Sequence, residues 1–134
     1  MMACGGGAVA LTETVAVSEA MMVRYDDTRL RLLDDYSPWR GPVERRLRRG
    51  GRAHVNVPYE QGWCYAYFAV AETSLLDLDM EVRDASGIVL GRDEMFDATP
   101  FVQYCADEPG VATVTLRAAR GRGATAVGAL RKPD

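Results

Sequence analysis

Three segments between Gly62 and Cys105 decide the fold of this chain: GWCYAYFAVA (residues 62–71), LDLDMEVRDASG (76–87) and FVQYC (101–105). The first is rich in aromatic and β-branched residues and predicts a central strand over 63–71. The second alternates with a period of two, which predicts a strand with one buried face. On that pattern Leu76, Leu78, Met80 and Val82 point inward, and Asp77, Asp79, Glu81 and Arg83 point outward.

Short strands and turn signals continue on both sides of these segments. Asp84-Ala85-Ser86-Gly87 is predicted to be a hairpin turn, with Gly87 at positive φ. Further strands are predicted over 43–47, 53–58, 88–91, 101–105, 111–118 and 124–130. The predicted fold class is therefore mostly β: an antiparallel, jelly-roll-like β-sandwich of about eight strands over residues 43–132.

One helix is predicted ahead of the sandwich, over residues 11–36. Thr12 and Thr14 are candidate N-caps, and Pro38 ends the helix because proline cannot continue it. An apolar face forms at helical spacing from Val15, Met21, Met22, Tyr25, Leu32 and Tyr36. This face either docks the helix on the sandwich or serves as a stalk or partner-binding surface.

The composition is that of an ordinary globular domain. The chain has 134 residues, is 48% hydrophobic and carries a formal net charge of -3. The length fits a single domain, and the mild negative charge argues against nucleic acid as a partner. No apolar run reaches the roughly 18 residues that a membrane-spanning helix needs.

Three cysteines leave one over after pairing, and Cys4 has its own explanation. Met1-Met2-Ala3-Cys4-Gly5 resembles the end of a bacterial lipoprotein signal, in which small residues flank a cysteine that receives lipid. The basic and hydrophobic parts of such a signal are missing, which a start upstream of Met1 would explain. The alternative is an incidental cysteine. Both interpretations make residues 1–10 a flexible leader.

Cys64 and Cys105 both fall in predicted strands and next to aromatic residues. If they form a disulfide, it closes a loop of roughly 40 residues and stabilises the fold by about 4 kcal/mol on the loop-entropy account. The alternative is two buried thiols. A zinc site is disfavoured, because His54 is the only histidine and no CxxC is present.

Two groups of charged residues are candidate ligand sites. Asp77, Asp79, Asp84 and Asp93 could supply oxygen ligands to calcium, or could be solvated and turn-capping acids. Arg45, Arg46, Arg48, Arg49 and Arg52 could contact an anionic surface, such as anionic lipid, phosphate or acidic glycan. The alternative is that these arginines protect an edge strand from pairing with another chain.

The sequence predicts no catalytic site. A Ser–His–Asp site would have to use His54, but no G-x-S-x-G is present, and Ser37, Ser74 and Ser86 fall in predicted turns. No glycine-rich phosphate loop follows a strand.

The order of the motifs resembles the bacterial pre-peptidase C-terminal domain. The matching residues are Gly62-Trp63-Cys64-Tyr65, Leu76-Asp77-Leu78-Asp79, Asp84-Ala85-Ser86-Gly87 and Glu108-Pro109-Gly110, within residues 43–131. The chain departs from the family at Ala112, where tyrosine is usual, and at Met80, where leucine is usual. The resemblance implies a jelly-roll-like sandwich without a catalytic site, and the added cysteine pair resembles lipoproteins of delta-type, myxobacteria-like bacteria.

We therefore expect a non-enzymatic protein of the bacterial cell envelope, periplasmic or on the surface, or a secreted one. It is expected to be lipid-anchored at Cys4 and to use its sandwich to bind an unidentified protein or glycan. Two alternatives stay open: a calcium-dependent carbohydrate- or matrix-binding module, and a soluble structural subunit that assembles through its N-terminal helix.

Overall fold

A computed structural model describes residues 8–10 and 17–134 of the chain, which form one helix and nine strands. Their bounds are β1 (Ala8–Ala10), α1 (Glu19–Leu32), β2 (Ser37–Leu47), β3 (Arg52–Tyr59), β4 (Trp63–Ala71), β5 (Leu75–Arg83), β6 (Val89–Asp93), β7 (Phe101–Cys105), β8 (Gly110–Gly121) and β9 (Gly123–Pro133).

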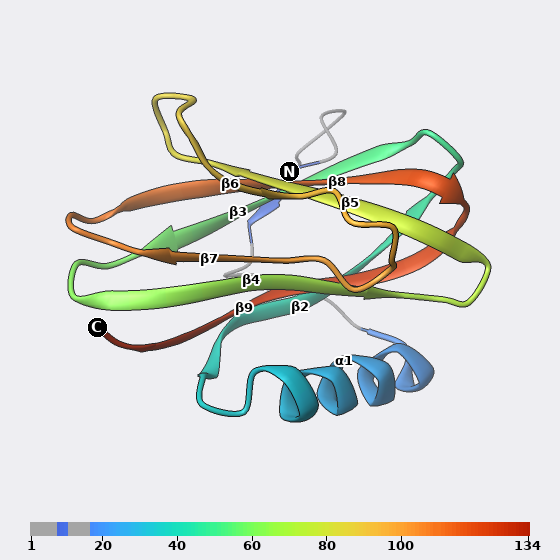
Figure 1. The fold of residues 1–134 in the computed structure, drawn as a ribbon, viewed down its shortest axis with the longest axis horizontal. Helices are drawn as coiled ribbons and strands as arrows, with labels where there is room; N and C mark the ends of the chain where they lie inside the picture. Colours follow the sequence, from blue (N-terminus) through green and yellow to red (C-terminus); the bar gives the residue numbers. More distant parts are fainter. Residues whose placement is uncertain (1–7, 11–16) are drawn as a thin grey trace.

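The strands form two stacked sheets, and the predicted sandwich is confirmed. One sheet has the order β2-β9-β4-β7 and the other the order β1-β3-β8-β5-β6. The antiparallel pairs β2/β9, β3/β8, β4/β7 and β5/β6 are nested in sequence, as in a jelly roll. The helix α1 lies against the outer face of the four-stranded sheet, so the molecule has three layers (Figure 1).

Strand β4 lies in the middle of the three-layer arrangement and is buried on both faces. Its side chains Tyr65, Tyr67 and Ala69 belong to the core between the sheets. Its alternate side chains Ala66, Phe68 and Val70 belong to a second core under α1. This explains why residues 63–71 read as a continuous apolar run rather than an alternating one.

The predicted disulfide is present between Cys64 and Cys105. The two residues are direct partners in the register of β4 and β7, with their Cα atoms 3.9 Å apart. The bond joins residues 41 positions apart, so the loop-entropy account gives it about 4 kcal/mol of stabilisation. It holds the edge strand β7 on the sheet.

The helix is shorter than predicted at both ends. It begins after Ser18, whose hydroxyl accepts a hydrogen bond from the Met21 amide, and it ends at Leu32. The predicted caps Thr12 and Thr14, and Val15, lie outside the described residues. The docking interpretation is confirmed, because Met21 and Tyr25 are buried against the sandwich, with the Tyr25 ring stacked 4.4 Å from that of Phe68.

The helix ends four residues earlier than predicted, at Leu32 instead of Tyr36. Leu32 is exposed, whereas Leu33 and Tyr36 are buried in the second core as the chain turns toward the sheet. Pro38, predicted to end the helix, lies inside β2 together with Pro42. Because β2 is an edge strand, it can accommodate residues that lack a backbone N–H.

The leader prediction was wrong for Ala8–Ala10, which form β1 and pair in parallel with β3. Residues 1–7, with Cys4, lie outside the part of the chain that the structure describes. Where it does describe the chain, no helix combines the length and the apolar character needed to cross a bilayer.

The predicted alternation of inward-facing and outward-facing side chains in β5 is wrong at the start of the strand. Leu76 is 54% exposed and Asp77 only 4% exposed, the reverse of what simple alternation predicts. Register shifts between β5 and β8 on both sides of Asp77 move its side chain to the buried side. From Leu78 to Val82 the apolar residues point inward as predicted.

We expect Gly128→Ala to weaken the docking of α1. A Cβ atom at this position of β9 would collide with the Tyr25 hydroxyl and would lie 3.0 Å from the Arg40 carbonyl oxygen. Overpacking of this kind costs roughly 1–3 kcal/mol in the free energy of unfolding, measurable by urea denaturation. The double variant Tyr25→Phe/Gly128→Ala should recover part of that loss because the colliding oxygen is removed. Equal stability of Gly128→Ala and the unchanged chain would contradict the prediction.

Candidate functional site

Two turns meet at one end of the sandwich and carry most of its free positive charge. The Gly50 amide, in the β2–β3 turn, donates to the Ala118 carbonyl oxygen of β8 at 2.8 Å. The Arg122 carbonyl, in the β8–β9 turn, accepts from the Ser74 hydroxyl at 2.7 Å. We call this region the basic end and define it by Arg48, Arg49, Arg52, Arg120 and Arg122.

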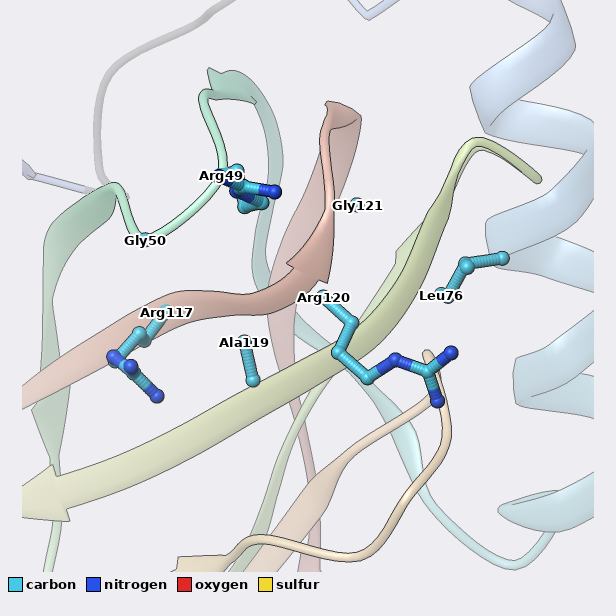
Figure 2. A pocket seen from close by; sticks show the side chains of 7 residues that line it. All are labelled: Arg49, Gly50, Leu76, Arg117, Ala119, Arg120 and Gly121. Atoms are coloured by element: carbon cyan, nitrogen blue, oxygen red, sulfur yellow. The ribbon is translucent and has the colours of Figure 1, made fainter.

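A pocket of about 500 Å³ lies at the basic end (Figure 2). In this view Arg117 and Arg120 extend from β8 on either side of Ala119, and Arg49 comes from the β2–β3 turn. The remaining lining residues are Gly50, Leu76 and Gly121. Small residues between long cationic side chains leave room for an anion to approach the guanidinium groups.

Two further pockets adjoin the first and share its arginines. One, of about 420 Å³, is lined by Arg49, Gly121 and Arg122. The other, of about 270 Å³, shares Arg117 and lies beside it on the outer face of the five-stranded sheet. It is lined by Arg52, Asp79, Met80, Glu81, Glu94, Thr115 and Arg117. The three pockets together run from the β8–β9 turn onto the face of the sheet.

The arginines of the basic end have no acidic partner among the described residues. Elsewhere Arg83 and Arg92 pair with Glu81, and Arg131 pairs with Glu60. Within residues 8–10 and 17–134, the side chains of Arg48, Arg49, Arg52, Arg120 and Arg122 form no ion pair or hydrogen bond. These five cations are therefore available to an external anion.

The opposite end of the sandwich is acidic. Asp84 lies in the β5–β6 turn, and Asp107 and Glu108 lie in the β7–β8 turn. Burial first, and then the negative charges of Asp107, Asp84 and Glu108, raise the pKa of the nearby Tyr104 hydroxyl. A chain with a formal net charge of -3 thus keeps opposite charges at its two ends.

A small group of acids lies beside the arginine pockets. Asp79 faces Arg117 at 3.5 Å and lines the same pocket as Glu94. Burial raises the pKa of Asp79, and the charges of Asp77 and Glu94 raise it further, against the opposing effect of Arg117. The buried Asp77 Oδ1 has no hydrogen-bond partner among the described residues.

The four candidate calcium ligands do not come together. Asp84 is separated from Asp77 by most of β5, and its carboxylate accepts from the Ser86 and Ile88 amides, both at 2.9 Å. Asp93 accepts from the Met95 and Phe101 amides. The only metal-ligating residues that cluster in the described ranges are Cys64, Cys105 and Asp134, and these cysteines are joined in the disulfide.

The predicted arginine run divides between two places. Arg45 and Arg46 lie on the edge strand β2, where Arg46 pairs with Glu72 at 3.2 Å. Arg48, Arg49 and Arg52 lie at the basic end. Sequence reasoning missed Arg117, Arg120 and Arg122, although the spacing RAARGR over 117–122 is a second basic run that could have indicated them.

The single histidine takes part in a cross-strand bond. His54 Nδ1 lies 2.8 Å from Thr115 Oγ1, on the outer face of the five-stranded sheet. The neighbouring pair Asn56 and Thr113 is also hydrogen-bonded, at 3.2 Å.

Comparison with known proteins adds no relative: no protein-family model matches the chain, and no curated protein matches it either. The resemblance to the pre-peptidase C-terminal domain therefore stays a prediction that rests on the sequence motifs.

The raised pKa of Asp79 predicts an unusual pH dependence. Because folding raises this pKa above its ordinary value of 3.8, the folded state binds the proton more tightly than the unfolded state. Protonation of Asp79 therefore adds to the free energy of unfolding as the pH falls from above its folded pKa toward 3.8. Asp79→Asn should remove this gain, so the variant should lose more stability than the unchanged chain between about pH 7 and about pH 4.

Asp84→Asn is the matched control, since hydrogen bonds from the Ile88 amide and from Ser86 lower the pKa of Asp84. Its stabilising effect is present above 3.8 and is lost as the pH falls through the lower folded pKa. A carboxyl titration followed by NMR checks both directions, and an Asp79 that titrates at or below 3.8 would contradict the assignment.

Proposed function

We propose that this chain is a non-enzymatic binding module of the bacterial cell envelope or of the secreted space. It is tethered by lipid at Cys4, and its basic end binds an anionic ligand. The sandwich is the binding domain for a protein or glycan partner.

The main support for an anionic ligand is the set of five arginines at the basic end. These arginines have no acidic partner among the described residues. Arginine forks suit carboxylate, sulfate and phosphate groups because they can donate two parallel hydrogen bonds. A solvated surface could also carry these charges. Four of the five, Arg49, Arg52, Arg120 and Arg122, line adjoining pockets, and this arrangement favours a binding site.

The disulfide supports an oxidising compartment. Disulfides persist in the periplasm, at cell surfaces and in secreted proteins, and are rare in a reducing cytosol. The Cys64–Cys105 bond uses two of the three cysteines. The third, Cys4, is the residue that the lipoprotein-like sequence would modify.

We expect the natively expressed protein to carry lipid on Cys4. Intact mass should show a diacylglyceryl-plus-acyl adduct, and Cys64 and Cys105 should resist alkylation until reduction. Cys4→Ser should lose the adduct and leave the membrane fraction. Cys64→Ser/Cys105→Ser is the matched control, because it removes the other two cysteines and their disulfide and should keep the adduct on Cys4. An unmodified chain with three free thiols would contradict the envelope proposal.

One observation favours calcium as a second candidate ligand. The buried Asp77 carboxylate has an oxygen without a partner among the described residues, and its negative charge acts on Asp79. A buried carboxylate oxygen without a hydrogen-bond donor is costly, and a bound cation would offset that cost.

Calorimetric titration with calcium should then show binding that Asp77→Asn abolishes and Asp84→Asn leaves unchanged. The expected selectivity follows from position, because Asp84 caps a turn at the other end of β5. Absence of binding below millimolar calcium would remove this candidate.

A further inference from the structure

We infer that the basic end docks on an anionic phospholipid surface, the same surface to which Cys4 would tether the chain. The inference rests on the proposed function, because the tether at Cys4 would bring the chain to the membrane. The arginines and the direction of β1 determine which end of the sandwich faces that membrane.

The direction of β1 places its first residue, Ala8, toward the basic end. Strand β1 runs parallel to β3, with Ala8 opposite His54 and Ala10 opposite Asn56. Because β3 begins at Arg52, the chain enters β1 from the side of Arg52 and the β2–β3 turn. A tether attached ahead of β1 therefore pulls on the basic end and leaves the acidic end facing away.

The length of chain between Cys4 and Ala8 limits how far the anchor can lie from the sandwich. Four residues span at most about 14 Å when fully extended. Ala8 lies opposite a residue two positions from Arg52, which is about 7 Å along the strand. Lipid on Cys4 would thus hold the arginines within one or two Debye lengths of the headgroups, where their charge is felt.

The distribution of charge favours one orientation on such a surface. Arg48, Arg49, Arg52, Arg120 and Arg122 lie at one end, and Asp84, Asp107 and Glu108 lie at the other. An anionic surface attracts the first end and repels the second. Each arginine near the surface is expected to strengthen binding about fivefold.

The pocket gives the arginines a shape that fits lipid phosphate. Arg49 and Arg120 line it together with Gly50, Ala119 and Gly121, which add little bulk to the pocket wall (Figure 2). A phosphate group entering here can accept two parallel hydrogen bonds from an arginine fork.

The test uses the full chain as Cys4→Ser, so that no lipid anchor contributes. Binding is measured to vesicles of phosphatidylcholine containing phosphatidylglycerol, and to vesicles of phosphatidylcholine alone. We expect binding to the anionic vesicles only, weakened by salt. Arg49→Ser/Arg120→Ser should weaken it about 25-fold, as two arginines at fivefold each.

The matched control is Arg83→Ser/Lys132→Ser, which makes the same change in net charge. Arg83 ends β5 and Lys132 lies near the end of β9, both remote from the basic end. The control should bind anionic vesicles nearly as well as the parent. An equal loss in both double variants, or equal binding to neutral vesicles, would overturn the inference.

Hydrogen exchange on the parent chain provides a second measurement that does not depend on the variants folding. Anionic vesicles should slow exchange at residues 48–52 and 119–122, and leave residues 84–87 unchanged. Protection at 84–87 instead would overturn the orientation. Binding to an acidic polysaccharide without binding to anionic vesicles would assign the pocket to a glycan and overturn the lipid inference.

Failure of the tether and failure of the docking give different results. If the native protein carries no lipid on Cys4 but still prefers anionic vesicles, the tether is contradicted and the docking is supported. If the native protein is lipidated but its Cys4→Ser form does not bind anionic vesicles, the tether is supported and the docking is contradicted.

Discussion

The double-sided burial of β4 is the constraint on which the rest of the structure depends. One set of its side chains fills the core between the sheets, and the alternate set supports α1. The strand therefore cannot tolerate polar residues on either face, and its neighbour β9 must be buried as well. The small residues of β9, Ala124, Ala126 and Gly128, then allow the helix to approach closely enough for Tyr25 to stack on Phe68. Three layers follow from one strand.

Much of the fold was predictable from local pattern, and the failures have physical causes. The aromatic run over 63–71 and the Asp84–Gly87 turn were placed correctly because burial and turn chemistry act within a few residues. The ends of the helix, the start of β2 and the orientation of the Asp77 side chain were predicted incorrectly. Each depends on a distant partner: the sheet that receives Leu33 and Tyr36, the open edge that admits Pro38 and Pro42, and the register shifts against β8. Single-sequence patterns do not carry that information.

The sequence indicated only part of the candidate site. Arg48, Arg49 and Arg52 stood out as a run, but their convergence with Arg120 and Arg122 depends on the pairing of β3 with β8 across more than fifty residues. The four predicted calcium ligands do not come together, because acids along one strand and its turn are spread along the length of that strand. Asp77 to Asp84 spans roughly 23 Å of strand, too far for one ion, whereas Glu94 approaches Asp79 from another part of the chain.

The nested pairing of the strands also bears on how the chain acquires its structure during synthesis. The last strand, β9, lies between β2 and β4 in the middle of its sheet, and β8 lies between β3 and β5 in the other. Until both have left the ribosome, the earlier strands of each sheet have gaps where their hydrogen-bonding neighbours belong. Such a domain gains its core late and nearly all at once, because its contacts join opposite ends of the sequence. The disulfide follows the same order, because it cannot close before Cys105, 41 residues after Cys64, has been synthesised.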